Sequence, residues 1–256
     1  MDPGDALRAA ERSLLAHARR GRIHVEAGAL LACLIPGEPE PFAHVAVPAG
    51  PEPSDWHASV AALLSLSGSQ GRVPRLEFMQ ELHPGLPRAL EAAGFRRDGS
   101  AAVMVTAERA AAPPRPLGSS LHLVDLAGAT GATLDAFVTE QARAFGMKAA
   151  TGRYFLGRLR DGLSEGVVAA VVLLEDGIPV SGATLLLADE AAELAGVWTA
   201  PERRRRGFAF AVCQALLEIA AQAGVTVWLS AADDVAGLYR DLGFRPVGTQ
   251  LDYSLP

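Results

Sequence analysis

Four consecutive arginines, Arg203 to Arg206, stand directly before a glycine in this 256-residue chain. Residues 193–199 ahead of them predict a β-strand, and apolar residues from Phe208 onward recur at helical spacing. A helix that begins just after a strand presents unpaired N–H groups and the positive end of its dipole at that point. Gly207 and Ala209 leave the backbone open to a bulky ligand group. The segment therefore predicts an anion site, and our working hypothesis is a bound pyrophosphate.

The arginine run has two simpler interpretations. It could be a solvated charged turn that binds nothing, or part of a nucleic-acid surface. The formal net charge of -6 argues against nucleic acid, because four arginines in an acidic chain are too local for such a surface. The position between a strand and a helix start with small residues favours the phosphate site over the solvated turn.

The spacing Arg204-x-x-Gly207-x-Ala209 resembles the Q/R-x-x-G-x-G/A signature of the GNAT superfamily of acyl-CoA-dependent N-acyltransferases, with alanine in the last small position. In that family the amides of the loop bind the pyrophosphate of coenzyme A. The resemblance implies that the backbone of Val197, Trp198 and Thr199 pairs with the pantetheine arm like an added strand. It also implies a pyrophosphate site made by Arg204, Arg205, Arg206, Gly207, Phe208 and Ala209.

Acyl transfer to an amine needs a general base for the amine and a proton donor for the departing thiolate. The segment from Leu238 to Phe244 looks like the family's L-Y-x-x-L-G-F segment, which implies that Tyr239 is the general acid. The alternative is a tyrosine packed under the sheet. Glu193 stands where some family members carry their base, and exposure at a strand end is the competing interpretation. Period-two alternation predicts one shared face for Glu193, Ala195, Val197 and Thr199.

The region after the next expected strand, residues 230–234, departs from the asparagine that the family often has there. Asp233 is the candidate for a side-chain contact to coenzyme A. The alternative is that Asp233 caps the helix expected over residues 233–242.

The resemblance implies an acetyl-CoA-dependent N-acetyltransferase that moves an acetyl group to a primary amine of a small molecule or peptide by direct attack. Acetyl-CoA is then a co-substrate. The six histidines form no i, i+4 pair and no cysteine-linked cluster, so no metal is expected. One rival is a non-catalytic acyl-CoA-binding or regulatory module. Another is an α/β interaction protein whose arginine turn has no ligand.

Composition narrows the class of protein further. Half of the residues are hydrophobic, which suffices for a substantial core. Cys33 and Cys213 lie in apolar runs, so buried free thiols are expected rather than a disulfide. The N-terminus is not typical of a signal peptide, and no run of about 18 apolar residues occurs. We therefore expect a cytoplasmic protein with no nucleic-acid or membrane partner, and a homodimer is left open.

A proline-rich segment at residues 111–116 predicts a linker, because closely spaced prolines block helix and sheet pairing. We expect a truncated GNAT-like domain without a cofactor site at residues 1–112, a linker at 113–120 and a catalytic GNAT domain at 121–256. The expected fold class is α/β, with an α+β mixed sheet of the GNAT-like acyl-CoA N-acyltransferase type. After the linker the expected order is β-α-β-β-β-α-β-α-β, and residues 146–165 show no clear periodicity.

The two parts share a local pattern. Residues 90–96 echo residues 239–245, each with a helix end, a glycine stop and a phenylalanine that opens a strand. Aligned backwards, residues 42–47 correspond to residues 193–199. The first copy has prolines and acids in residues 49–56, where the second has the arginine turn. Because proline lacks an N–H and acids repel phosphate, we predict that the first copy binds no coenzyme A and instead completes the sheet and the substrate cleft.

Overall fold

The computed structural model describes residues 2–40, 43–70, 73–106 and 120–256. The chain forms two compact units. The first unit comprises Met1–Met104, Ser230–Ala236 and Pro246–Pro256, and the second comprises Val105–Leu229 and Gly237–Arg245. The expected linker at 113–120 falls almost wholly outside the described residues, so the division of the chain at that point stays a prediction.

The first unit begins with a long helix and ends with a long strand. In chain order its elements are α1 (Pro3–Arg19), β1 (Ile23–Ala27), β2 (Leu30–Leu34), β3 (Val45–Pro48), α2 (Trp56–Gln70), β4 (Arg75–Met79), α3 (Leu86–Ala92) and β5 (Arg96–Thr106), of which the last two residues of β5 belong to the second unit. Residues 96–106 form one continuous strand, which begins directly after Phe95. The strand at 42–47 begins later than expected, and residue 42 lies outside the described residues.

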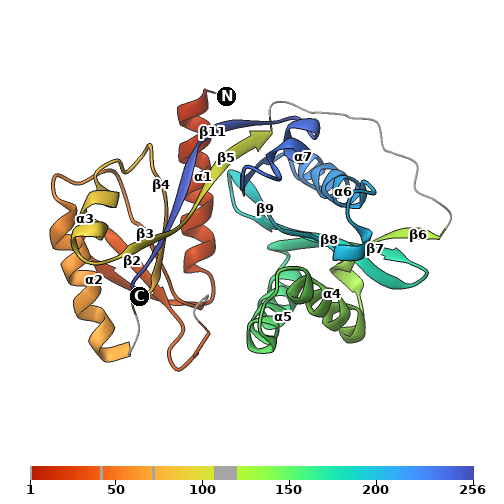
Figure 1. The fold of residues 1–256 in the computed structure, drawn as a ribbon, viewed down its shortest axis with the longest axis horizontal. Coiled ribbons are helices and arrows are strands. Elements are labelled where there is room, and N and C mark those ends of the chain that lie inside the picture. The colour runs from red at the N-terminus through yellow and green to blue at the C-terminus, as the bar shows by residue number, and fades with distance from the viewer. Residues whose placement is uncertain (1, 41–42, 71–72, 107–119) are drawn as a thin grey trace. The chain divides into compact units, whose positions relative to one another are not determined.

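The sheet of the first unit has the order β1-β2-β3-β4-β11-β5. β3 and β4 are parallel, whereas β11 (Phe244–Ser254) runs antiparallel to β4 with Leu251 opposite Phe78. Figure 1 shows α2 and α3 on one face of this sheet and α1 on the other. The core under α2 and α3 includes Leu63, Phe78 and Tyr253, and the rings of the last two stack at 5.9 Å between centroids.

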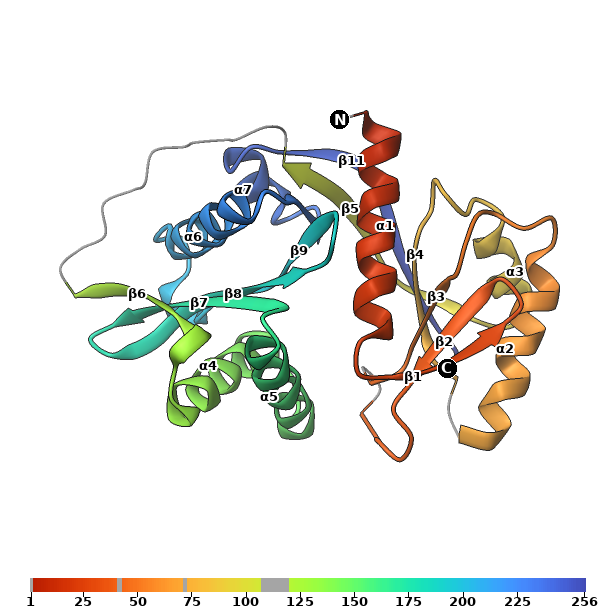
Figure 2. The same ribbon diagram turned by 180° about the vertical axis from the view of Figure 1, so that it is seen from behind.

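The second unit follows the order expected after the linker, with one helix more. Its elements are β6 (Leu121–Asp125), α4 (Gly131–Ala144), α5 (Ala149–Ser164), β7 (Val168–Glu175), β8 (Ile178–Leu187), β9 (Ala191–Thr199), α6 (Phe208–Ala223), β10 (Thr226–Ala231) and α7 (Ala236–Asp241). Its sheet has the order β10-β9-β8-β7-β6, antiparallel except for the parallel pair β9 and β10. Figures 1 and 2 show α4 and α5 on one face of β7, β8 and β9, and α6 and α7 on the other.

Helix α5 is the element that sequence periodicity missed. It occupies most of residues 146–165, and three of its positions are glycines that weaken helix propensity, Gly152, Gly157 and Gly162. The helix forms because its apolar residues pack into the core of the second unit, where Leu159 belongs to one buried cluster with Phe137, Val138 and Trp198. Tertiary burial therefore outweighs the low local propensity.

The two halves of the chain repeat one order of elements. β3-α2-β4-α3-β5 in the first half matches β9-α6-β10-α7-β11 in the second, and the first two strands of each series are parallel. The fold therefore fits a tandem fusion. The compact units do not follow the chain strictly, because β11 pairs with β4 and contributes residues 246–256 to the first unit.

Two simple observations complete the fold. Cys33 and Cys213 are buried free thiols, as expected. Among the described residues, no helix has the length and apolar character to cross a membrane.

Candidate functional site

The arginine turn, residues 200–207, joins β9 to α6. After Thr199, residues Pro201–Arg203 form a short 3-10 helix, and Arg204 is extended. Arg205 and Gly207 then adopt positive φ values of 64° and 82°. A positive φ is uncommon for a residue with a side chain, so Arg205 has an unusual, left-handed backbone conformation. The two left-handed residues bend the chain sharply into the first turn of α6.

The N-terminus of α6 has no side-chain cap. Gly207 occupies the N-cap position and makes no side-chain hydrogen bond. The N–H of Ala211 donates to the Gly207 carbonyl at 3.1 Å, which starts the helical ladder. The N–H groups before Ala211 stand outside that ladder, at the positive end of a 16-residue helix. The turn therefore has the geometry that binds anions at helix N-termini.

Two of the four arginines pair with one carboxylate that the sequence did not single out. Glu175, the last residue of β7, has Arg203 Nε 2.6 Å from its Oε2 as an ion pair without hydrogen-bond geometry. Arg206 Nη2 donates a hydrogen bond to Glu175 Oε1 at 2.8 Å. The Arg206 guanidinium also lies 4.6 Å from the centroid of the Phe208 ring. No local pattern could have revealed Glu175, because it lies 28 residues before its partner Arg203 in the sequence.

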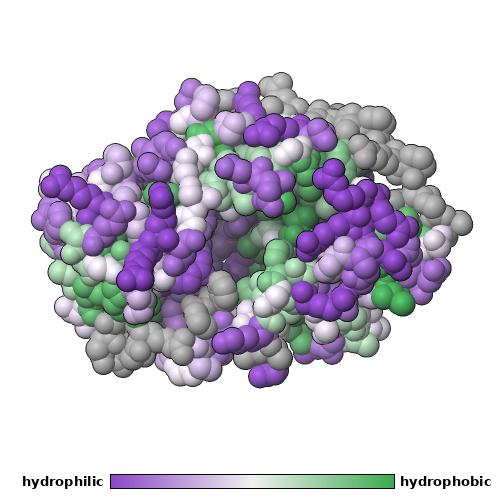
Figure 3. Space-filling model, in the orientation of Figure 1, coloured by the Kyte–Doolittle hydropathy of each residue, from purple (hydrophilic) through white to green (hydrophobic). Residues whose placement is uncertain are grey.

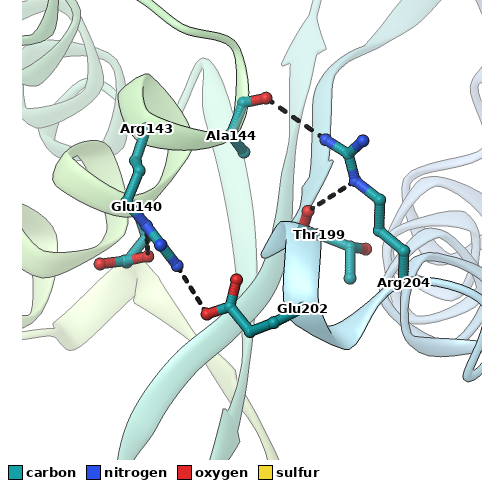
Figure 4. Close-up of polar contacts among 6 residues, drawn as sticks. All are labelled: Glu140, Arg143, Ala144, Thr199, Glu202 and Arg204. Carbon is teal, nitrogen blue, oxygen red and sulfur yellow. Dashed lines mark hydrogen bonds and ion pairs between the residues drawn. The ribbon is translucent and has the colours of Figure 1, made fainter.

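Arg204 points in a different direction. Figure 4 shows its guanidinium facing two backbone carbonyls, those of Thr199 and Ala144, each accepting a hydrogen bond at 3.4 Å. Beside it, Arg143 of α4 bridges Glu140 at 2.9 Å and Glu202 at 2.8 Å. The hydrogen bond from Arg143 lowers the pKa of the Glu202 carboxyl. The end of α4 is thus attached to the arginine turn through exposed polar contacts.

A β-bulge in β9 overturns the predicted shared face. Opposite β8, Ala195 pairs with Thr184 but Trp198 pairs with Gly182, so one extra residue lies between them. Gly196 has a φ of 59° there, and its carbonyl accepts a hydrogen bond from Gln141 of α4 at 2.9 Å. The extra residue shifts the alternation, so Glu193 and Ala195 share a face with Trp198 and not with Thr199. Periodicity cannot anticipate such a shift.

The edge of β9 beyond Glu193 is open in the described structure. The pairing of β9 with β10 covers Ala191 to Glu193 opposite Thr226 to Trp228. The N–H of Ala200 donates to Val180 of β8 at 2.9 Å, and the Ser181 hydroxyl donates to the carbonyl of Trp198 at 2.7 Å. The backbone of Trp198 therefore faces β8, and alternation turns Thr199 and Val197 toward the other edge. The Trp198 side chain is buried against Phe137.

Tyr239 lies on α7 with its side chain only 8% exposed. Its ring packs edge-on against Phe244 at 6.0 Å between centroids. Burial, assisted by the nearby Cys213 of α6, raises the pKa of the Tyr239 hydroxyl above its ordinary value. The hydroxyl therefore stays protonated well above neutral pH, as a proton donor requires.

Asp233 is not the helix cap that was the alternative for this residue. The helix expected from 233 begins at Ala236, and the N–H of Ala236 donates to the carbonyl of Ala232 at 3.1 Å. Asp233 therefore lies three residues before the first residue of α7 and not directly next to it, where a cap residue stands. Asp233 is exposed in the turn and belongs to the first compact unit.

A cavity of about 490 Å³ lies between α4 and α5. Its floor is apolar, with Val138 and Leu156, and Arg143 and Arg153 stand at its lining. Arg143 connects this cavity to the arginine turn through Glu202. Within the described ranges, no group of three histidine, cysteine, aspartate or glutamate residues could hold a metal ion.

Figure 3 shows how polar the surface around the turn is. Strongly hydrophilic residues gather on the second unit over the region where Figure 1 labels α6 and β7. In the turn itself, Arg204, Arg205 and Arg206 are exposed and Arg203 is partly buried. Such a basic, exposed turn is accessible to a charged ligand.

Comparison with known proteins shows a family match over part of the chain and a similar fold over nearly all of it. Residues 134–244 match the model of the acetyltransferase (GNAT) family. The structure is similar to a GCN5-related N-acetyltransferase from Kribbella flavida, at 21% identity and a TM-score of 0.77, over 98% of this chain and 95% of that one. A GCN5-related N-acetyltransferase from Sphaerobacter thermophilus is similar at 14% identity and a TM-score of 0.69, over 99% and 93%.

A third solved structure has a tandem arrangement. The tandem GNAT protein from the clavulanic acid biosynthesis pathway, solved without AcCoA, is similar at 14% identity and a TM-score of 0.62. The similarity covers 89% of this chain and 78% of that one. No match was found among curated proteins. Residues 134–244 therefore match the acetyltransferase (GNAT) family, and the whole chain has a fold similar to that of GNAT proteins, which fits a tandem fusion.

Proposed function

We propose that this protein transfers an acetyl group from acetyl-CoA to a primary amine of a small molecule or peptide, by direct attack and without a covalent enzyme intermediate. The observation that carries the proposal is the uncapped N-terminus of α6, directly after the open edge of β9 and an arginine-rich turn. The family supports acetyl transfer from acetyl-CoA in general. The amine acceptor and the direct attack are the parts that we add.

The residues present fit coenzyme A. The backbone N–H groups at the start of α6, which has no side-chain cap, suit a pyrophosphate together with Arg204, Arg205 and Arg206 of the turn. The outward-facing backbone of Val197 and Thr199 suits an extended amide chain such as pantetheine. Asp233 is proposed as a further side-chain contact. When bound, acetyl-CoA supplies the activated acetyl thioester.

Glu193 and Tyr239 are proposed as the acid–base residues. Glu193 is half-buried at the last paired position of β9, where the strand leaves β10. Its carboxylate would accept the proton of the acceptor amine, directly or through a water molecule. Tyr239 would hold a proton at its hydroxyl oxygen and donate it toward the leaving sulfur, which its raised pKa permits up to alkaline pH.

Thermal unfolding with and without acetyl-CoA tests the binding step. At 100 times its Kd, a ligand of the folded state adds about 2.7 kcal/mol. For a chain of this size that raises Tm by about 5–10 °C. A Tm unchanged at millimolar acetyl-CoA contradicts the proposal. Glu52→Gln, in the first half, is the matched control and should leave the ligand-induced shift intact.

Release of free coenzyme A thiol with a panel of amines then tests catalysis. Tyr239→Phe removes the proton donor and should reduce turnover about 100-fold, while the ligand-induced Tm shift stays. Wild-type turnover in this variant rules out Tyr239 as the acid. A Tm shift without turnover on any amine favours the non-catalytic acyl-CoA-binding module.

A further inference from the structure

Glu175 holds two of the four arginines of the turn. Its side chain is only 13% exposed, whereas those of Arg203 and Arg206 are 43% and 45% exposed. The two contacts are 2.6 and 2.8 Å long and reach different carboxylate oxygens. Glu175 is thus a largely buried carboxylate between two guanidinium groups at the end of β7.

The four arginines are therefore not equivalent. Arg203 and Arg206 are engaged with Glu175, and Arg206 is further fixed by the Phe208 ring. Arg204 meets only backbone carbonyls, at 3.4 Å, among its described contacts. Arg205 has a positive φ, and no ion pair joins it to another residue of the described part of the chain. Hydrogen bonds as long as 3.4 Å are weak. The Arg204 guanidinium can therefore exchange them for contacts to a phosphate at a small cost in free energy.

We propose that Glu175 is a positioning residue for the pyrophosphate of coenzyme A. By holding Arg203 and Arg206, it fixes the first and last of the four arginines, so that the backbone N–H groups and the side chains of Arg204 and Arg205 converge on the ligand. A site that is shaped before binding loses less conformational entropy when the ligand arrives. This inference rests on the proposed function, because it concerns the same coenzyme site.

The opposite role for Glu175 makes the opposite prediction. If Glu175 merely competed with phosphate for Arg203 and Arg206, removing its charge would tighten binding of any anion. Glu202 provides the matched control, because it lies in the same turn and carries the same charge but is 54% exposed and contacts Arg143 instead. Glu175→Gln and Glu202→Gln therefore change the net charge equally and differ in the contacts removed.

Titration calorimetry with coenzyme A decides between the two roles. Glu175→Gln should raise the Kd about tenfold, which is about 1.4 kcal/mol, while Glu202→Gln should change it less than about twofold. Glu175→Asp keeps the charge but reaches less far, so its Kd should lie between those of the wild type and Glu175→Gln. A Kd for Glu175→Gln equal to or below that of the wild type overturns the inference.

A purely structural role needs its own control. Val171, a buried residue of β7, can be shortened to alanine to lower Tm without touching the turn. Val171→Ala should leave the Kd for coenzyme A unchanged well below its Tm, and a Kd raised as much as in Glu175→Gln overturns the positioning role. If the wild type itself binds no coenzyme A, the proposed function fails as well. If it binds and Glu175→Gln binds equally, only this inference fails.

Discussion

The arginine turn and the proline turn, residues 49–55, occupy the same place in the two repeats, between a strand and a helix. In the arginine turn, Gly207 leaves the N-terminus of α6 without a side-chain cap. In the proline turn, the Asp55 carboxylate accepts a hydrogen bond from the N–H of His57 at 2.8 Å, in the first turn of α2. The start of α2 is thus capped by a carboxylate of the chain itself, whereas the start of α6 has no side-chain cap.

The proline turn is also attached to its surroundings. Glu52 accepts a hydrogen bond from the N–H of Gly85 at 2.9 Å. His83, which is 1% exposed, bonds to Glu11 of α1 at 2.6 Å and contacts the Trp56 ring edge-on. These contacts suit a structural segment. They support the prediction that the first half binds no coenzyme A.

The two turns lie at equivalent places in the repeated order of elements but differ in their side chains. Both turns precede a helix of 15 or 16 residues whose first N–H groups and dipole attract negative charge. The identity of a few residues decides whether that charge comes from the protein or from a ligand. Introducing a carboxylate cap at the start of α6 should therefore weaken acetyl-CoA binding there.

The largest effect should come from giving α6 a cap of its own. Gly207→Asp places a carboxylate at the N-cap of α6, where it bonds to the free N–H groups and repels pyrophosphate. We expect the Kd for acetyl-CoA to rise about 100-fold by titration calorimetry, which is about 2.7 kcal/mol. Gly207→Asn has nearly the same shape without the charge, so a loss just as large in that variant would point to backbone strain instead.

Removing the Arg204 guanidinium, which contacts only backbone carbonyls among its described partners, should have a smaller effect. Arg204→Ala should raise the Kd for acetyl-CoA about tenfold and make it less sensitive to salt, because a charge-assisted phosphate contact is lost. Arg160→Ala is the control, since that exposed arginine pairs with Asp135 away from the turn. Equal Kd values for the two variants would show that Arg204 makes no special contact.

The two buried thiols allow a comparison of stability between the halves. Burial raises the pKa of Cys213 from 9.0 to about 12, so the native state keeps a proton that the unfolded chain loses above pH 9. The buried, protonated Cys213 thiol therefore makes its full contribution to the free energy of unfolding below pH 9. That free energy falls as the pH rises, by about 1 kcal/mol at pH 10. Urea unfolding at pH 8 and pH 10 should show a smaller pH effect in Cys213→Ala.

Cys33 provides the control for that experiment. Burial also raises the pKa of the Cys33 thiol, but Arg22 and Arg19 oppose the shift. Cys33→Ala should therefore reduce the alkaline loss of stability less than Cys213→Ala does. The reverse order would contradict the account of the two thiols.

The smallest effect should come from the cap of the proline turn. Asp55 is exposed, so Asp55→Ala should lower the urea midpoint of unfolding only slightly, at the low end for an N-cap. Acetyl-CoA binding should be unchanged in this variant. A raised Kd would show that the first half takes part in the coenzyme site.

Much of the fold could be read from local patterns, and the remainder depends on distant contacts. The spacing of Arg204, Gly207 and Ala209 and the repeated order of elements were visible because helix starts and strand alternation are local properties. The bulge at Gly196 was not, since one inserted residue shifts every later side chain to the other face. Helix α5 and the partner of Arg203 and Arg206 depend on packing and pairing between segments far apart in the sequence.

The most direct test of the central claim is the stoichiometry of acetyl-CoA binding in a calorimetric titration of the whole chain. The account predicts one site per chain, which Gly207→Asp removes and Asp55→Ala leaves intact. Two sites per chain, or a site that survives in Gly207→Asp and disappears in Asp55→Ala, would contradict it.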